Sequence, residues 1–157
     1  MTTILEALRT LAIGVSLCAV GGCGSAGPLA AGPAIGSEVE QFVQLVNEHR
    51  RSIGCAGLEW SGAVARVAQA HSEDMLSRGF FDHRNPSGQS PGDRLRAAGI
   101  LWTGWAENIA YGRPTAQSAL DAWLDSPGHR SNIDNCSLTR HGVGLAGTHW
   151  THVFLRP

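Results

Sequence analysis

The stretch Trp123–Ile133, W-L-D-S-P-G-H-R-S-N-I, ends a helix abruptly and places a histidine directly after it. Pro127 and Gly128 cannot continue a helix, so we expect His129 on a sharp turn. The three residues that follow it are short or polar and suit a binding or catalytic site. By itself the motif fits a surface turn whose histidine caps the preceding helix at least as well, so its meaning depends on the rest of the chain.

Length and composition fit a single globular domain. The chain has 157 residues, 43% of them hydrophobic and 16% charged, and its formal net charge is −1. This length supports one sizeable core without help from a metal or a second subunit. The arginines are scattered and the chain contains no lysine, so no basic patch for nucleic acid is expected.

The N-terminal segment has the pattern of a targeting signal. The apolar run Leu11–Val20 is about half as long as the roughly 20 residues that cross a bilayer, so it fits a signal-peptide core better than a permanent span. The sequence V-G-G-C at Val20–Cys23 resembles a bacterial lipobox, in which the signal is cut before a cysteine that carries a lipid. We therefore predict a lipoprotein signal peptide over residues 1–22 and lipidation of Cys23.

The predicted location follows from this segment. A lipidated Cys23 would tether the exported protein to the outer face of the cell membrane. The Gly-, Ala- and Pro-rich residues 23–36 would then form a linker to a folded domain over residues 37–157. Two alternatives stay open: secretion without a lipid after cleavage near Ala26 or Ala31, and retention of the segment as an anchor.

The four cysteines agree with export. Cys18 lies in the apolar run and would leave with the signal peptide, and Cys23 would carry the lipid. Cys55 and Cys136 are then left to form one disulfide in an oxidising compartment. The alternative is a pair of buried thiols.

Capping residues and apolar spacing predict four helices in the rest of the chain. On the second of them, His71 falls on the apolar face, and we expect it to be a hydrogen-bonded core residue. The predicted helices cover residues 37–51, 61–77, 90–98 and 115–123.

A hairpin is predicted near the C-terminus. The extended segments 141–146 and 149–155 are joined by Gly147 and Thr148, as in an antiparallel hairpin. Alternate residues of a strand face opposite sides. His149 and His152 therefore cannot bind one metal together, although they read H-x-x-H.

Two further residues stand out as site candidates. His83 precedes a loop rich in turn formers, residues 84–92, where an ordinary surface role would also fit. Glu107 lies between Trp105 and Ile109 with no charged neighbour. Burying a carboxylate there demands a cation, a proton or several hydrogen bonds.

Taken together, the motifs of the chain resemble those of the CAP superfamily, which comprises the cysteine-rich secretory, antigen 5 and pathogenesis-related 1 proteins, and its short bacterial members above all. The resemblance covers residues 39–154, and it depends on the order and spacing of several short motifs. These are N-E-H-R at 47–50, L-E-W at 58–60, A-x-x-H-S-E-D-M at 68–75, G-F-F-D-H at 79–83, E-N-I-A at 107–110, W-L-D-S-P-G-H-R-S-N-I at 123–133 and G-V-G-L at 142–145.

The resemblance implies an α+β fold, a three-layer α-β-α sandwich with a small antiparallel sheet between helices. It also implies a surface cleft lined in many members by two histidines and two acidic residues. Three of these positions match His83, Glu107 and His129. The second acidic position is occupied by Ser126, with Asp125 beside it, which departs from the family pattern. We expect Ser126, Asp125 and Asn108 to support the cleft.

Three functions are compatible with this pattern. The first is an exported, membrane-tethered binding module whose cleft takes a lipid, a glycan or an envelope protein. The second is a zinc-dependent hydrolase of peptide or cell-envelope polymer, because two histidines and a carboxylate can hold Zn²⁺ with one open position. The third is a disulfide-stapled structural domain whose cleft binds nothing. We favour the first, since the resemblance implies binding or signalling more often than catalysis, and we assign no catalytic residue.

Overall fold

The computed structural model describes residues 35–157, and the predicted signal peptide, Cys23 and the linker up to residue 34 lie outside the described residues. α1 begins at Ile35, two residues before the predicted start of the domain. The described elements, in chain order, are α1 (Ile35–Ser52), β1 (Glu59–Trp60), α2 (Gly62–Arg78), α3 (Pro91–Ala97), β2 (Gly104–Ala110), α4 (Ala116–Leu124), α5 (Pro127–Ile133), β3 (Arg140–Ala146) and β4 (His149–Arg156).

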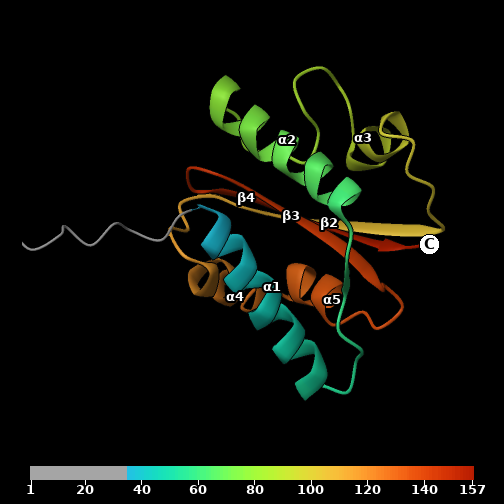
Figure 1. Ribbon diagram of the computed structural model, residues 1–157. Helices are drawn as coiled ribbons and strands as arrows, with labels where there is room; N and C mark the ends of the chain where they lie inside the picture. Colours follow the sequence, from blue (N-terminus) through green and yellow to red (C-terminus); the bar gives the residue numbers. More distant parts are fainter. Residues whose placement is uncertain (1–34) are drawn as a thin grey trace, which may run out of the picture. The chain divides into compact units, whose positions relative to one another are not determined.

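These elements form three layers. A four-stranded sheet of order β1-β3-β4-β2 lies between α2 and α3 on one face and α1, α4 and α5 on the other (Figure 1). The α+β class and the α-β-α sandwich are thereby confirmed. The sheet is mixed, because β1 pairs in parallel with β3 through Glu59 and Trp60, whereas β2, β3 and β4 are antiparallel.

The predicted hairpin of β3 and β4 is confirmed, and its side chains alternate between the two helical layers. Trp150 and His152 pack against Phe42 of α1, with ring centroids 5.7 and 5.1 Å from it. Thr151 instead accepts a hydrogen bond from Ser72 of α2. This alternation separates neighbouring histidines of β4, as the period of two predicts.

Two glycines of β3 let α2 lie directly on the sheet. A Cβ atom on Gly144 would lie 2.3 Å from the backbone nitrogen of Gln69, and one on Gly142 would lie 2.1 Å from that of Ala65. Side chains at these positions would push α2 away from the sheet. The close approach also brings the Gln69 side chain to the outer edge of β3, where it donates to the Leu145 carbonyl at 3.0 Å and accepts from the Leu145 amide at 2.9 Å.

Local capping explains where most helices begin and end. Ser61 caps α2, which ends at the left-handed Gly79. Ser90 and Asp93 form a capping box on α3, and Thr115 caps α4. Each of these ends agrees with the sequence prediction.

The stretch after α4 differs from the prediction. Pro127 does not lead into a sharp turn but occupies the first turn of a new helix, α5, so His129 is helical. Proline is well tolerated at this position because its missing N–H would have no partner there. The prediction of a turn at His129 was therefore wrong.

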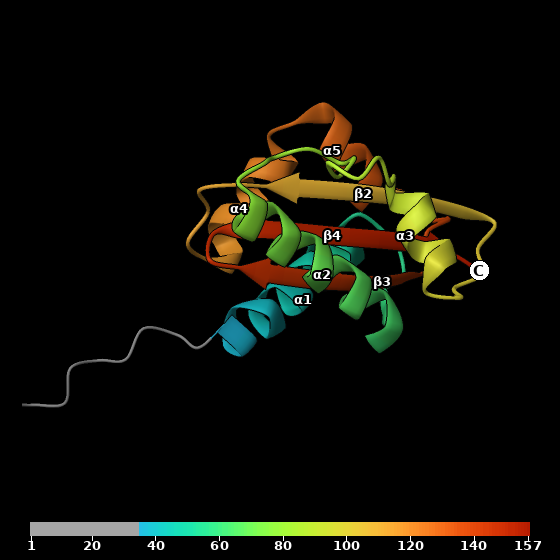
Figure 2. The same ribbon diagram turned by 90° about the horizontal axis from the view of Figure 1, so that it is seen from above.

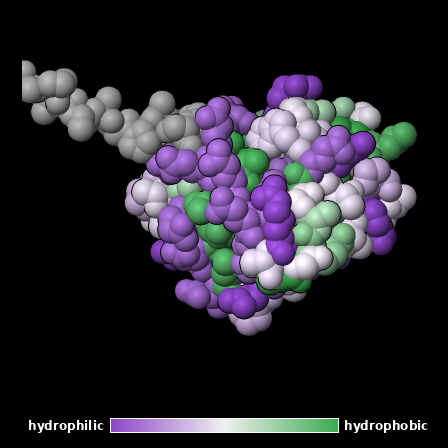
Figure 3. All heavy atoms as spheres, turned by 60° about the horizontal axis from the view of Figure 1, so that its bottom comes forward, coloured by the Kyte–Doolittle hydropathy of each residue, from purple (hydrophilic) through white to green (hydrophobic). Residues whose placement is uncertain are grey.

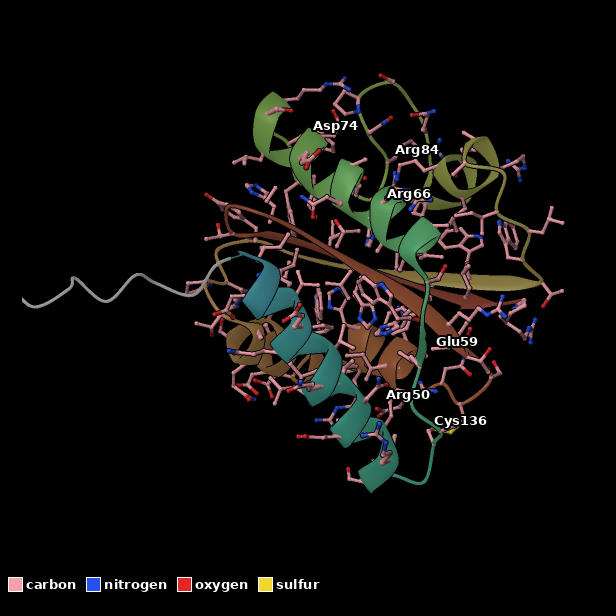
Figure 4. The ribbon with its side chains drawn as sticks, viewed as in Figure 1. Arg50, Glu59, Arg66, Asp74, Arg84 and Cys136 are labelled. Carbon is pink, nitrogen blue, oxygen red and sulfur yellow. A yellow bond between two sulfur atoms is a disulfide. The ribbon has the colours of Figure 1, made fainter. Side chains whose placement is uncertain are left out.

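The buried guanidinium of Arg50 holds α1 to the segment that follows α5. Arg50 is 1% exposed and donates to four backbone carbonyls, those of Ala56, Ile133, Asn135 and Leu138. The predicted disulfide between Cys55 and Cys136 is present in the same region, near Arg50 (Figure 4). Burial lowers the pKa of Arg50.

No helix within residues 35–157 is both long and apolar enough to cross a membrane. On the face shown in Figure 3, hydrophobic atoms form narrow strips between hydrophilic side chains. That face therefore presents no broad apolar surface.

Candidate functional site

Glu107 is a buried carboxylate whose two oxygens are both occupied. It lies on β2 opposite Val153 of β4, and its side chain is 1% exposed. One oxygen is 2.9 Å from Nδ1 of His83, and the other accepts a hydrogen bond of 2.7 Å from Arg94. A cation and a second polar partner thus satisfy the requirement that burial of a carboxylate imposes.

Arg94 connects Glu107 to the loop that carries His83. Besides its contact with Glu107, it donates to the His83 carbonyl at 2.8 Å and to the Gln89 carbonyl at 3.2 Å. Arg94 lies on α3, which begins at the Ser90 capping box. The Arg94 guanidinium therefore links α3, the loop that carries His83, and β2.

The His83 ring is held at one nitrogen and accessible at its other edge. Its side chain is 47% exposed, in contrast to that of Glu107. Because Nδ1 faces Glu107, the orientation of the ring is set and Nε2 is left to meet a ligand. A buried carboxylate that orients an accessible imidazole is a common arrangement in binding and metal sites.

His129 lies on the other side of β2. Its backbone carbonyl accepts from Asn108, and the Asn108 oxygen in turn accepts from Asn132. Figure 2 shows α5, which carries His129, beside the edge strand β2. Burial lowers the pKa of His129, and a charge on His83 lowers it further.

The three predicted cleft residues are therefore only partly brought together. His83 and Glu107 are in direct contact, whereas Glu107 faces the α2 and α3 layer and α5 carries His129 on the opposite layer. Within residues 35–157, no group of three or more His, Cys, Asp or Glu side chains is arranged to hold a metal ion. Each Glu107 oxygen already has one partner, His83 or Arg94, and the zinc set of His83, Glu107 and His129 stays a prediction.

The predicted supporting residues have different positions. Asn108 reaches the backbone of His129, as described. Ser126 precedes α5 without a side-chain capping bond, and Asp125 is exposed at the end of α4. Within the described residues, neither side chain makes a hydrogen bond to His83, Glu107 or His129.

Two residues of the site were missed by sequence reasoning. The need for a cation near Glu107 was evident, but nothing in the spacing singles out Arg94 among the twelve arginines. Asn132 lies within a quoted motif, yet its role depends on α5 packing beside Asn108. His71 behaves as predicted: it is buried, and its Nε2 is 3.0 Å from the Asp82 carbonyl.

The described surface has two hollows. One, of about 720 Å³, runs along α2 and includes Arg94 in its wall; the other, of about 690 Å³, lies between α1 and α2 and is mostly apolar. Neither is lined by His83, Glu107 or His129. The predicted site is thus an exposed histidine edge next to a buried carboxylate.

The fold and this site define a class of α-β-α sandwich proteins, and sequence comparison identifies the family. The sequence model of the cysteine-rich secretory protein family, CAP, matches residues 43–154. The chain belongs to this family.

Individual relatives agree with this assignment. The chain is 36% identical over 118 residues to the uncharacterized protein YkwD of Bacillus subtilis (strain 168), covering 74% of this chain and 46% of YkwD. It is 36% identical over 117 residues to YlbC, an uncharacterized membrane protein of the same organism, covering 74% of this chain and 34% of YlbC. The chain therefore spans less than half the length of these relatives.

A solved structure shows the same fold. It is that of an extracellular protein containing an SCP domain from Bacillus anthracis str. Ames, which superimposes with a TM-score of 0.76 at 32% identity. The match covers 81% of this chain and 45% of that protein.

Proposed function

We propose that this CAP-domain protein is exported, tethered to the membrane through a lipid on Cys23, and acts as a binding module through the site of His83, Glu107 and His129. The ligand would be a lipid, a glycan or a protein of the cell envelope. One observation carries the proposal: Glu107 is fully engaged in holding His83 and Arg94. It therefore orients an accessible imidazole instead of offering a free base.

Export has independent support. A disulfide joins Cys55 and Cys136, and disulfides persist mainly in oxidising compartments. The Bacillus anthracis relative is described as extracellular and YlbC as a membrane protein. Mass spectrometry of the protein from its native membranes tests the anchor: a diacylglyceryl group on Cys23 is expected, and a mature chain that begins elsewhere without lipid would contradict it.

Binding at the site is tested by following the ring signals of His83 and His129 by NMR. Phosphatidylglycerol bicelles and solubilised peptidoglycan fragments serve as probes, and we expect one of them to shift both rings. His83→Ala and His129→Ala should each weaken that binding about tenfold, equivalent to about 1.4 kcal/mol. Glu48→Ala, an exposed change on α1, is the matched control. Binding that both histidine variants retain would refute the proposal.

A zinc-dependent hydrolase is the second candidate. It is favoured by the pairing of His83 Nδ1 with a carboxylate, which resembles the support that metal-binding histidines receive. Only two histidine nitrogens would face the metal, however, whereas catalytic zinc sites use three protein ligands. Zinc titration followed by calorimetry, together with a peptidoglycan hydrolysis assay, tests it. Hydrolysis that survives both His83→Ala and His129→Ala would exclude chemistry at this site.

A further inference from the structure

The outer edge of β2 carries backbone groups that no other strand uses. In the sheet order β1-β3-β4-β2, β2 has a neighbouring strand on one side only. Successive residues of a strand in an antiparallel sheet direct their N–H and C=O groups alternately to one side and to the other. Every second residue of β2 therefore directs these groups away from β4.

The alternation can be followed across the sheet from Gln69. Both backbone groups of Leu145 bond to the Gln69 side chain and thus face away from β4. Trp150, which lies opposite Leu145, must then bond to β2, where its partner is Ala110. The pairing of β2 with β4 continues without a bulge back to Gly104. The residues of β2 whose backbone groups face outward are therefore Trp105, Glu107 and Ile109.

One contact agrees with this assignment and closes one end of the edge. The indole of Trp123 donates to the Ile109 carbonyl at 3.0 Å, which a carbonyl bonded within the sheet would not require. Within the described residues, the outward backbone groups of Trp105 and Glu107 make no hydrogen bond. The free β2 edge thus comprises the N–H and C=O groups of Trp105 and Glu107 and the N–H of Ile109.

Solvent reaches this edge at Glu107. The residue as a whole is 6% exposed, whereas its side chain is 1% exposed, so most of its exposed area belongs to the backbone. Trp105, the next outward residue, is 37% exposed. A ligand can therefore approach the peptide groups while the Glu107 carboxylate stays bonded to His83 and Arg94.

The two edges of the sheet are protected differently. The edge of β3 is covered by β1 and, farther along, by the side-chain amide of Gln69. The sequence of β2, G-W-A-E-N-I-A, contains no proline, lysine or arginine, and its pairing has no bulge. Proteins commonly use these features to prevent an edge from pairing with another chain. Their absence from β2 leaves this edge able to accept a strand.

The free β2 edge lies between the elements that carry the two histidines of the proposed site. His83 contacts Glu107 from the loop between α2 and α3, and His129 lies on α5 in the opposite layer (Figures 1 and 2). A strand added at this edge would direct its side chains alternately toward the two layers. One side chain would then face the His83 loop, and the next would face α5.

A peptide backbone is the ligand that complements such an edge. It presents one donor and one acceptor on the same side every two residues, about 6.8 Å apart, and it can join a sheet as a further strand. Neither the hydroxyls of a glycan nor the chains of a lipid have this repeat. At His83, Nδ1 faces a carboxylate, which accepts, so Nε2 of the neutral ring is an acceptor. A hydroxyl side chain of the peptide suits this nitrogen.

We propose that the free β2 edge binds an extended peptide segment as an additional strand, with a hydroxyl side chain at His83. The inference rests on the proposed function, because it names the chemical class of ligand for the same site. Residues 24–34, which precede α1, are a poorer occupant, because Pro28 and Pro33 lack the N–H that a paired strand donates.

Amide hydrogen exchange followed by NMR tests the proposal on the full chain in a zwitterionic detergent. The probe is the uncharged peptide acetyl-TVTVT-amide. We expect it to bind with a Kd below about 1 mM and to slow exchange of the Trp105 and Glu107 amides at least tenfold. The amides of Ala106 and Asn108, which face β4, are the matched control and should exchange slowly with and without the probe.

Modified probes distinguish strand pairing from binding through side chains alone. A probe that is methylated at every backbone nitrogen cannot donate to β2, and its binding should be lost. A probe with alanine in place of threonine lacks the hydroxyls and should bind about tenfold more weakly. That difference should disappear in His83→Ala, because the acceptor is then missing as well.

A variant of the edge itself complements the probes. Trp105→Pro removes one donor of the free β2 edge without removing a bond to β4. It should weaken binding at least tenfold relative to Trp105→Ala, which removes the indole and keeps the N–H.

Three outcomes would overturn the proposal. They are exchange of the Trp105 and Glu107 amides that the probe does not slow, equal binding of the fully methylated probe, and protection of these amides before any probe is added. The last would mean that a second copy or another part of the chain covers the edge.

The same measurements separate this inference from the proposed function. If bicelles or peptidoglycan fragments shift the rings of His83 and His129 but the peptide leaves the edge amides unprotected, the proposed function stands and the inference is wrong. If the peptide protects the edge amides and both His83→Ala and His129→Ala keep full affinity, strand addition is supported and the role of the histidines is refuted.

Discussion

Replacing Arg94 by methionine should destabilise the protein more than any other single arginine change in the α3 region. The Glu107 carboxylate is 1% exposed and the Arg94 side chain 9%. Methionine keeps much of the apolar stem of arginine but leaves the carboxylate with His83 alone. Removing one partner of a buried ion pair costs about 3–5 kcal/mol, and we expect a loss in this range.

The assay is urea unfolding followed by tryptophan fluorescence at pH 7. Glu107→Gln keeps hydrogen-bonding atoms but loses the charge, so it should cost about 1.5–3 kcal/mol. The double variant should cost less than the sum of the two by about 1 kcal/mol or more, because neither charge is then left unpaired.

Arg96→Met supplies the matched control. Arg96 lies on the same helix and pairs with Asp93 at 3.0 Å, but the two side chains are 68% and 46% exposed. An exposed pair contributes less than about 1 kcal/mol. If Arg94→Met costs no more than Arg96→Met, Arg94 does not have the role assigned to it.

Three other predictions concern the fold. Gly144→Ala should cost about 3 kcal/mol or more in urea unfolding, because its Cβ would meet the Gln69 backbone at 2.3 Å; Gly128→Ala, with no atom within 4 Å, is the control, and an equal effect of the two would refute the reasoning. Replacing both Cys55 and Cys136 by serine opens a link between residues 81 apart and should cost about 4–5 kcal/mol; a variant as stable as the oxidised protein would contradict this. Burial lowers the pKa of His141 to about 4 and that of its partner His152 well below 6.5, so only the unfolded chain gains protons as the pH falls from about 6.5 to 4. The free energy of unfolding should be greatest above pH 6.5 and fall by up to about 1.4 kcal/mol per pH unit for each histidine; His152→Phe should reduce that slope, and an unchanged slope would show that other groups cause it.

The sequence allowed the elements to be predicted where local chemistry determines them. Ser61, Ser90 and Thr115 cap their helices through bonds to residues three positions on, so the signal is contained in a few neighbouring residues. Pro127 misled the prediction because the same residue can end one helix or begin the next. Which of these occurs depends on α5 packing against β2, which is a tertiary effect.

The site was predictable only in part for a similar reason. The motifs identified His83, Glu107 and His129, and the burial of Glu107 implied a cation. That this cation is Arg94, 13 positions earlier in the chain, depends on how α3 packs over the sheet. The hydrogen bond of 3.0 Å between His141 and His152 could not be predicted either, because it depends on the register in which β3 pairs with β4.

The side-chain amide of Gln69 covers part of the free edge of β3. β1 pairs with β3 only at Arg140 and His141, and the two bonds from Gln69 to Leu145 occupy backbone groups farther along the same edge. An open edge of this kind recruits strands from other molecules. By imitating one peptide unit of a neighbouring strand, a single side chain discourages the sheet from growing into an aggregate.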